Sequence, residues 1–311
     1  MQEKLKKIIN NVCKVIIGKE EVIELALAAM LAEGHILFED VPGTGKTILA
    51  RSLARSTGCE FKRIQFTPDL LPSDVTGVSI YNQQSNKFEF REGPVFSQVL
   101  LADEINRATP RTQSCLLESM AEGQVTVEGE SRKVPAPFIV MATQNPIEYE
   151  GTFPLPEAQL DRFLVRLELG YPTASEEVQI ITGQQKIHPI EELEPVVVDS
   201  ELLELQADIK EITVKESVRQ YIVNIVRQTR THHNLELGVS PRGSLGIFRM
   251  SRALAAIRGR DYVIPDDIKE IAPVVLKHRM VLKQESRLRG ISEEGIIEGI
   301  LNSVEIPGGA G

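Results

Sequence analysis

The stretch Asp40-Val-Pro-Gly-Thr-Gly-Lys-Thr47 decides the fold of this 311-residue chain. It follows a short apolar run and precedes an amphipathic helical pattern, which is the context expected for the phosphate-binding loop GxxxxGK[ST]. Asp40 takes the place of the first glycine of that pattern. Gly43 and Gly45 let backbone N–H groups point at phosphate oxygens, and the N-terminus of the next helix adds a positive field. The stretch therefore predicts a site for phosphate groups.

Two side chains of this loop have distinct expected roles. Lys46 would neutralise the β- and γ-phosphates of a nucleotide, and the Thr47 hydroxyl would bind Mg²⁺. A chance glycine-rich turn is the alternative, and the strand–loop–helix context argues against it. The loop residues expected to surround the nucleotide are Pro42, Gly43, Thr44, Gly45, Lys46, Thr47 and Ile48.

Polar side chains follow two further apolar runs. Residues 99–102 lead into Asp103 and Glu104, and residues 140–144 lead into Asn145. At the carboxyl edge of a parallel sheet these groups would lie beside the phosphate loop. Asp103 would hold Mg²⁺, Glu104 would polarise the water that attacks the γ-phosphate, and Asn145 would orient that water. A solvated strand end and a turn-forming Asn-Pro pair are the alternatives.

The wider pattern predicts an α/β fold with a parallel sheet covered by helices on both faces. Short apolar runs at residues 35–38, 60–66, 98–102, 137–142 and 164–169 are the strand candidates, and helical patterns separate them. Residues 77–91 and 122–135 alternate around polar tips, which predicts two inserted β-hairpins. Helical periodicity then dominates, so we expect a nucleotide-binding domain over residues 1–172 and an all-α lid domain over residues 173–311.

Composition excludes several classes of protein. Lys and Arg total 35 against 44 Asp and Glu, and this net charge of −9 argues against a protein whose affinity comes from neutralising nucleic-acid phosphates. No apolar run approaches the roughly 20 residues that span a bilayer, and the first residues lack a signal-peptide pattern. The three widely spaced cysteines fit reduced thiols, so we expect a cytoplasmic protein.

Taken together, the order of these motifs resembles that of AAA+ ATPases, and the residues within and around them resemble those of the MoxR family. Five segments carry the likeness to MoxR proteins, which extends over nearly the whole chain: Phe66-Thr-Pro-Asp-Leu-Leu-Pro-Ser-Asp74, Asp103-Glu-Ile-Asn-Arg-Ala108, Ala142-Thr-Gln-Asn-Pro146, Phe153-Pro-Leu-Pro-Glu-Ala-Gln-Leu-Asp-Arg-Phe163 and Gly259-Arg-Asp-Tyr-Val-Ile-Pro-Asp-Asp267. The resemblance implies ATP and Mg²⁺ as cofactors.

The resemblance also implies roles for two arginines. Arg162 matches the arginine finger, which acts on the ATP of a neighbouring subunit, with a surface arginine or an intrachain ion pair as the alternative. Arg107 and Arg166 are nearby competitors for that role. Arg242 matches the sensor 2 arginine of the lid, and whether it acts on its own ATP or on a neighbour's stays open.

A third implied site is the adenine pocket. Val15-Ile16-Ile17-Gly18 matches the segment that packs on adenine, with Ile16, Ile17 and Gly18 as the contacts. An ordinary helix-turn core is the rival interpretation of this segment.

For function, the resemblance implies a homo-oligomer, expected to be a hexameric ring, that remodels protein complexes like a chaperone. A protein client is expected, with a von Willebrand factor A domain protein as a candidate. The hairpins at 77–91 and 122–135 match the helix-2 insert and the pre-sensor-1 insert, which face the pore and touch the client in related machines. Inert decorations are the alternative.

A nucleic-acid motor and a nucleotide-gated scaffold with poor hydrolysis are the rival functions. The acidic charge counts against the first, and the Asp103-Glu104 pair counts against the second.

Overall fold

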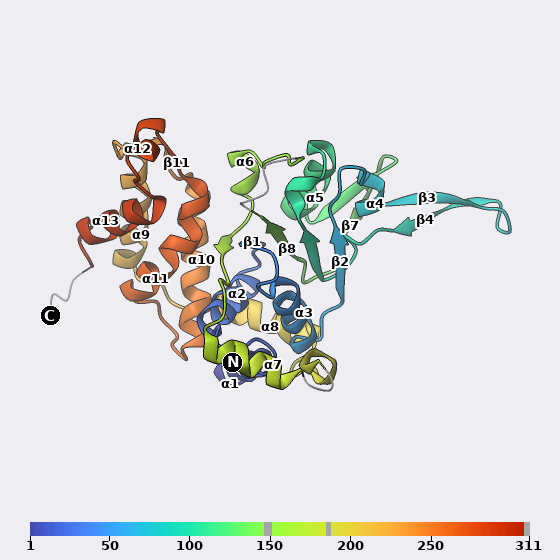
Figure 1. Ribbon diagram of the computed structural model, residues 1–311, viewed down its shortest axis with the longest axis horizontal. Helices are drawn as coiled ribbons and strands as arrows, with labels where there is room; N and C mark the ends of the chain where they lie inside the picture. Colours follow the sequence, from blue (N-terminus) through green and yellow to red (C-terminus); the bar gives the residue numbers. More distant parts are fainter. Residues whose placement is uncertain (146–150, 185–187, 308–311) are drawn as a thin grey trace.

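A five-stranded parallel sheet forms the centre of the N-terminal half in the computed structural model, which describes residues 1–145, 151–184 and 188–307. The strand order is β2-β5-β8-β1-β9, and neighbouring strands all run parallel. The strands are β1 (Ile36–Glu39), β2 (Phe61–Gln65), β5 (Val99–Asp103), β8 (Ile139–Gln144) and β9 (Val165–Leu167). All five predicted apolar runs therefore form strands of one sheet, as Figure 1 shows.

Helices cover both faces of this sheet because alternate side chains of each strand point to opposite sides. In β5, Val99 and Leu101 pack in a cluster with α1 (Gln2–Cys13), α2 (Glu20–Leu31) and α3 (Lys46–Ser56). Leu100 and Ala102 pack instead with α4 (Pro72–Thr76) and α5 (Pro110–Glu122). Burial on both faces explains why these strands read as continuous apolar runs rather than as alternating ones.

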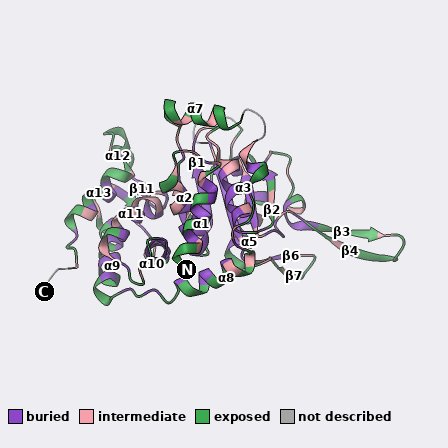
Figure 2. Ribbon diagram, turned by 90° about the horizontal axis from the view of Figure 1, so that it is seen from below, coloured by how far each residue is buried: buried purple, intermediate pink, exposed green. Residues whose placement is uncertain are grey.

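Two antiparallel hairpins interrupt the α/β pattern, as predicted. The first pairs β3 (Gly77–Asn82) with β4 (Lys87–Glu92), and the second pairs β6 (Gln124–Val127) with β7 (Glu130–Lys133). The β3–β4 hairpin projects far from the body of the molecule, and it is exposed along most of its length (Figures 1 and 2).

The second half of the chain is mainly helical. Its helices are α6 (Glu157–Leu160), α7 (Ala174–Gly183), α8 (Asp199–Ile209), α9 (Glu216–Thr231), α10 (Pro241–Ile257), α11 (Pro265–Leu276), α12 (Gln284–Leu288) and α13 (Glu293–Ser303). A small two-stranded sheet also joins β10 (Leu235–Leu237) to β11 (Val281–Leu282) within this half. Sequence patterns did not predict it, because runs of two or three residues are too short to show alternation.

The chain after residue 172 first returns to the α/β core before it builds the bundle of α9–α13. Asn11 Nδ2 donates to the carbonyl of Glu194 at 2.9 Å, and Gln206 Nε2 donates to the carbonyl of Met30 at 2.8 Å. Helix α10 of the bundle also packs on α2 of the core. The domain boundary at residue 172 stays a prediction. No helix in the described part of the chain is long and apolar enough to cross a membrane.

A buried histidine ties β1, β8 and α5 together. The Nδ1 atom of His35 accepts the backbone N–H of Val140 at 3.0 Å, so Nε2 carries the proton and donates to the carbonyl of Met120 at 3.1 Å. Both ring nitrogens are therefore used in the neutral form. Burial lowers the pKa of His35 to about 4.

This burial predicts a loss of stability in mild acid. Between about pH 6.5 and 4 the unfolded chain takes up a proton at His35 that the folded chain refuses, so the free energy of unfolding falls as the pH falls. From about pH 7.5 to about pH 5.8 the expected loss is about 1 kcal/mol. Urea unfolding of wild type and His35→Gln at both pH values measures it.

The Gln variant removes the titrating ring, so its pH dependence should be smaller than that of wild type by about 1 kcal/mol. The buried His278, whose pKa also lies well below its ordinary value, contributes equally to both proteins and cancels. Equal pH dependence in the two proteins would contradict the assignment.

Candidate functional site

The glycine-rich stretch forms the connection between β1 and α3. Gly43 (φ +85°) and Gly45 (φ +94°) lie in the left-handed region, where side chains other than glycine are strained. Apart from the adjacent residues, no atom of the described part of the chain lies within 4 Å of the position of a Cβ on either residue, so backbone conformation, rather than crowding, requires glycine there. Helix α3 begins directly afterwards at Lys46, which leaves its free N–H groups beside the loop.

Lys46 is held at the inner side of this loop. Its Nζ donates to the carbonyl oxygens of Asp40 at 2.7 Å and Val41 at 2.8 Å. An ammonium group has three donors, so one is left for a phosphate oxygen. Burial lowers the pKa of Lys46, and the charges of Asp40, Asp103 and Glu104 oppose that shift. The three carboxylates thus favour the charged form that a phosphate ligand needs.

The carboxylates and the loop line one cavity of about 340 Å³ at the carboxyl edge of the sheet. Of the residues predicted for this site, it brings together the loop, both carboxylates and Asn145. The lining residues are Pro42, Gly43, Gly45, Lys46, Thr47, Ile48, Asp103, Glu104, Thr143, Gln144 and Asn145. Pro146, the partner of Asn145 in the predicted Asn-Pro turn, lies outside the described residues.

Asp103 is oriented by two neighbouring strands. The hydroxyl of Thr143, on β8, donates to Oδ1 at 2.6 Å. Arg63, on β2, forms an ion pair with Oδ2 at 2.6 Å. The same Thr143 hydroxyl accepts the backbone N–H of Glu104 at 2.8 Å. Thr143 therefore orients both members of the acidic pair.

Glu104 has an unusual backbone and a constrained carboxylate. Its φ is +54°, in the left-handed region that residues with a Cβ seldom adopt, and such outliers concentrate at functional sites. Its Oε2 accepts from Gln65 Nε2 at 2.7 Å and pairs with Arg107 at 3.1 Å. Arg107, a competitor for the finger role, is thus engaged in an ion pair within the chain.

Arg63, Gln65 and Thr143 were not predicted from the sequence patterns. Two of them become recognisable only when the strand order is known, because β2 pairs with β5 in a register that sets Gln65 opposite Asp103. Thr143 could have been recognised as the second-last residue of β8, a strand that pairs with β5.

A second cavity, of about 230 Å³, adjoins the loop on its other side. It shares Gly43, Gly45 and Ile48 with the first cavity. Its lining is Val15, Ile16, Ile17, Lys19, Gly43, Thr44, Gly45, Ile48, Gly170, Pro172, Ile180, Gln184 and His188. The apolar side chains here suit the flat face of a base. Ile16, Ile17 and Thr44 thus lie where the sequence predicts the nucleotide.

Gly18, by contrast, lines neither cavity. A Cβ built on it would lie 1.9 Å from the Glu176 carboxylate of α7, and its φ is +72°. The positive φ favours glycine at this position, whereas the flexible Glu176 side chain could move aside for a Cβ. The contact of Gly18 with adenine stays a prediction.

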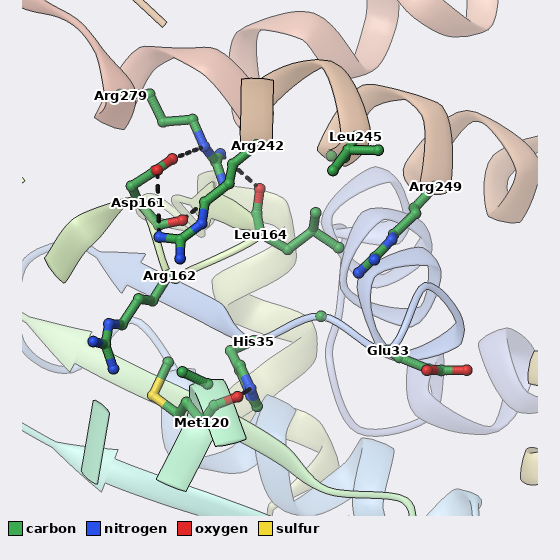
Figure 3. A pocket seen from close by; sticks show the side chains of 13 residues that line it. Glu33, His35, Met120, Asp161, Arg162, Leu164, Arg242, Leu245, Arg249 and Arg279 are labelled. Carbon is green, nitrogen blue, oxygen red and sulfur yellow. Dashed lines mark hydrogen bonds and ion pairs between the residues drawn. The ribbon is translucent and has the colours of Figure 1, made fainter. Parts of the chain in front are cut away.

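The structure places Arg162 and Arg242 away from both cavities. They line a third one, of about 310 Å³, between the core and α10, together with Asp161, Arg249 and Arg279 among others. Figure 3 shows Arg242 and Arg279 directed at Asp161, while Arg162 extends in another direction. Arg162 precedes β9, so it lies at the edge where the parallel strands begin, whereas the phosphate loop lies where they end.

Asp161 is the centre of this third site. Its carboxylate accepts from Arg279 Nε at 2.8 Å and from the Ser240 hydroxyl at 3.0 Å, and it pairs with Arg242 at 3.6 Å. Arg162 donates to the carbonyl of Leu117 on α5. Arg166, the other competitor for the finger role, instead forms an ion pair with Glu39 at 2.7 Å.

Comparisons with known proteins support this description. Residues 35–165 match the model of the ATPase family associated with various cellular activities (AAA), and residues 227–300 match that of an AAA lid domain. The chain is 53% identical over 303 residues to the protein YeaC of Bacillus subtilis, covering 97% of this chain and 95% of that one. It is 43% identical over 312 residues to the chaperone MoxR1 of Mycobacterium tuberculosis, covering 97% and 82%.

A solved structure agrees with these relatives. The crystal structure of a candidate ATPase from Cytophaga hutchinsonii superposes with a TM-score of 0.92 at 41% sequence identity. The match covers 98% of this chain and 95% of that one.

Substitutions at the loop and at the acidic pair should have different effects. Lys46→Ala removes the positive partner of the phosphates, so Mg-ATP binding measured by calorimetry should weaken by at least tenfold, the equivalent of about 1.4 kcal/mol. Glu104→Gln keeps the shape of the side chain but removes the base, so ATP should still bind and persist unhydrolysed.

Wild-type affinity in Lys46→Ala would count against the loop as the phosphate site. A loss of binding in Glu104→Gln as large as that in Lys46→Ala would show that Glu104 is structural rather than catalytic.

Proposed function

Because this chain belongs to the MoxR family of AAA+ ATPases, we propose that it is one subunit of an ATP-driven ring that remodels a protein client. Family membership makes the chain an ATPase that binds and hydrolyses ATP. AAA+ proteins typically assemble as rings.

One observation carries the proposal of a ring. The phosphate loop and acidic pair line one cavity, whereas Arg162 and Arg242 line another at the opposite edge of the sheet. A charge that stabilises the transferring phosphoryl group must contact it directly. The chain therefore offers half of a site at each edge, which supports a head-to-tail assembly in which each subunit completes its neighbour's site.

Within one subunit, the loop and Lys46 bind the β- and γ-phosphates, and Ile16 and Ile17 pack on the base. Thr47 and Asp103 would hold Mg²⁺, and their oxygens suit it, since Mg²⁺ in such sites takes one or two protein ligands plus waters and phosphates. When bound, the ion neutralises charge on the phosphate oxygens. Among the described residues no cluster of three or more His, Cys, Asp or Glu offers an all-protein metal site, which agrees with a metal shared with substrate.

Glu104 acts as the general base toward the attacking water, and Asn145 orients that water. The Glu104 carboxylate is hydrogen-bonded to Gln65 and Arg107, which restrict its rotamer. Proton transfer therefore requires the carboxylate to turn toward the water or to accept a third hydrogen bond. Thr143 keeps Asp103 and Glu104 in register during this step.

From the neighbouring subunit, Arg162 and Arg242 approach the γ-phosphate. Asp161, which precedes Arg162 in the chain, forms an ion pair with Arg242, and both arginines line the same cavity. This arrangement supports action of Arg242 on a neighbour's ATP, a question that the sequence leaves open.

The proposed client surface is the β3–β4 hairpin. Tyr81 and Phe88 stand opposite each other on it with ring centroids 5.3 Å apart, and Phe88 is 74% exposed. An exposed aromatic pair on a projecting arm is typical of a protein contact. The name of the relative MoxR1 supports a chaperone role, and a von Willebrand factor A domain protein stays a proposed partner. The alternative, a motor acting on nucleic acid, is not favoured by the net charge of −9.

Subunit mixing tests the shared site. Arg162→Ala should bind ATP but hydrolyse it slowly, since an arginine finger contributes on the order of 10³ or more in rate. Lys46→Ala should be inactive as well. When the two variants exchange subunits in equal amounts, about a quarter of the interfaces in a head-to-tail ring combine both intact residues, so ATPase activity should partly recover.

The matched control is a mixture of Lys46→Ala with the double variant Lys46→Ala/Arg162→Ala, in which no interface is complete. If mixed rings form and the test mixture is no more active than this control, Arg162 acts within its own chain or not at all. Arg107 would then be the next residue to substitute.

The hairpin should matter for client binding more than for hydrolysis. In a Glu104→Gln background, Tyr81→Ser/Phe88→Ser should reduce the amount of co-purified polypeptide, because the aromatic pair is removed. The same pair of changes in wild type should leave basal ATPase largely intact. Lys87→Ser, on the opposite face of the same hairpin, is the control and should change neither. A collapse of ATPase with unchanged client binding would contradict the client-facing role.

A further inference from the structure

The residue that departs from the general phosphate-loop pattern has contacts on both sides of the candidate nucleotide pocket. We propose that Asp40 is a positioning residue that joins the phosphate loop to the base-side wall, so that binding of phosphate and binding of the base reinforce each other. This inference rests on the proposed nucleotide pocket. Asp40 is not itself expected to touch the reacting atoms.

The carboxylate of Asp40 is buried and fully used. Asp40 is only 9% exposed. Its Oδ1 accepts the backbone N–H of Val41 at 2.8 Å. Its Oδ2 accepts the backbone N–H groups of Leu169 at 2.9 Å and Gly170 at 2.8 Å. One carboxylate thus binds three backbone donors from two segments that are far apart in the sequence.

These donors belong to the two walls of the pocket. Val41 is the first step of the phosphate loop, and the carbonyl oxygens of Asp40 and Val41 both accept from Lys46. On the other side, Gly170 lines the base-side cavity together with Pro172. A continuous path of hydrogen bonds therefore runs from the Lys46 ammonium, through Asp40, to the segment that borders the base.

The chemistry of this position requires a carboxylate. An ionised carboxylate only accepts hydrogen bonds and has room for all three N–H groups. The amide of asparagine would keep one acceptor but direct an NH₂ group at a backbone donor. The glycine of the general pattern would leave buried N–H groups without an acceptor, which is costly beside the buried Leu169. The hydrogen bonds of Asp40 to Val41, Leu169 and Gly170 thus explain why an aspartate replaces the first glycine of the pattern.

Two consequences follow for nucleotide binding. Loss of the carboxylate separates the two walls, so ATP, which contacts both, should lose more affinity than inorganic triphosphate, which contacts only the loop. Asp40 contacts neither Asp103 nor Glu104 through any hydrogen bond of the described chain, so hydrolysis of bound ATP should change little. A loss shared by ground state and transition state raises KM and leaves kcat nearly unchanged.

The experiment uses the full chain with Asp40→Asn and Asp40→Gly. The dissociation constants of Mg-ATP and of inorganic triphosphate are measured by calorimetry or by displacement of a fluorescent nucleotide. For Asp40→Asn we expect ATP to bind roughly tenfold more weakly, with Asp40→Gly weaker still. The factor lost by ATP should exceed that lost by triphosphate at least about threefold, and kcat should stay within about threefold of wild type.

Glu39→Gln is the matched control. Glu39 also links β1 to β9 through a carboxylate, in its case by the ion pair with Arg166. Its loss removes the same charge from the same place in the fold but leaves the N–H groups of Leu169 and Gly170 bound. It should keep wild-type affinity for ATP and triphosphate, and thermal melting shows whether all variants fold.

A measurement on wild type makes the test independent of variant folding. Amide hydrogen exchange at Leu169 and Gly170 should slow when inorganic triphosphate binds, although triphosphate does not extend to the base-side wall. The proposal is overturned if exchange there is unaffected, if Asp40→Asn and Asp40→Gly bind ATP like wild type, or if ATP and triphosphate lose equal factors. Failure of the underlying pocket would be recognised separately, because Lys46→Ala would then still bind ATP.

Discussion

The pairing of β8 with β5 on one side and β1 on the other is the interaction on which the candidate site depends. Parallel hydrogen bonding makes the three strands end along one line. The loop after β1, the acidic pair at the end of β5 and the polar end of β8 therefore lie side by side. Thr143, in the middle strand, then bonds to both Asp103 and Glu104. The chemistry is thus arranged by rigid elements rather than by flexible segments.

Much of this arrangement could be predicted from sequence because it follows from strand ends. Lys46, Asp103 and Asn145 each follow an apolar run, and parallel strands bring such ends together. The missing partners, Arg63 and Gln65, lie on β2, and their contacts depend on the order of strands in the sheet. A linear pattern holds no information on that order. For a similar reason the segment at residues 188–209 could not be assigned to the core, since its helical periodicity is the same wherever it packs.

The charges around the site favour the binding of a polyphosphate. Lys46 lies near three carboxylates, which oppose the effect of burial on its charge. Asp103 and Glu104 are each already paired with an arginine, so the acidic pair carries less unbalanced negative charge toward an incoming polyphosphate than its formal charge suggests. Repulsion between substrate and base is thereby reduced at the point where the two must come close.

The bonding of Arg279 has a mechanical consequence. This buried guanidinium follows α11 of the bundle, yet it bonds to Asp161 and to the carbonyls of Phe163 and Leu164, which lead directly into β9 of the sheet. Burial lowers its pKa only to about 10, so it stays charged and fully engaged near neutrality. Arg279 therefore links the helical bundle to the segment that contains Arg162 and leads into β9. In the proposed ring, a subunit could not swing its bundle without displacing the arginine that it lends to the next.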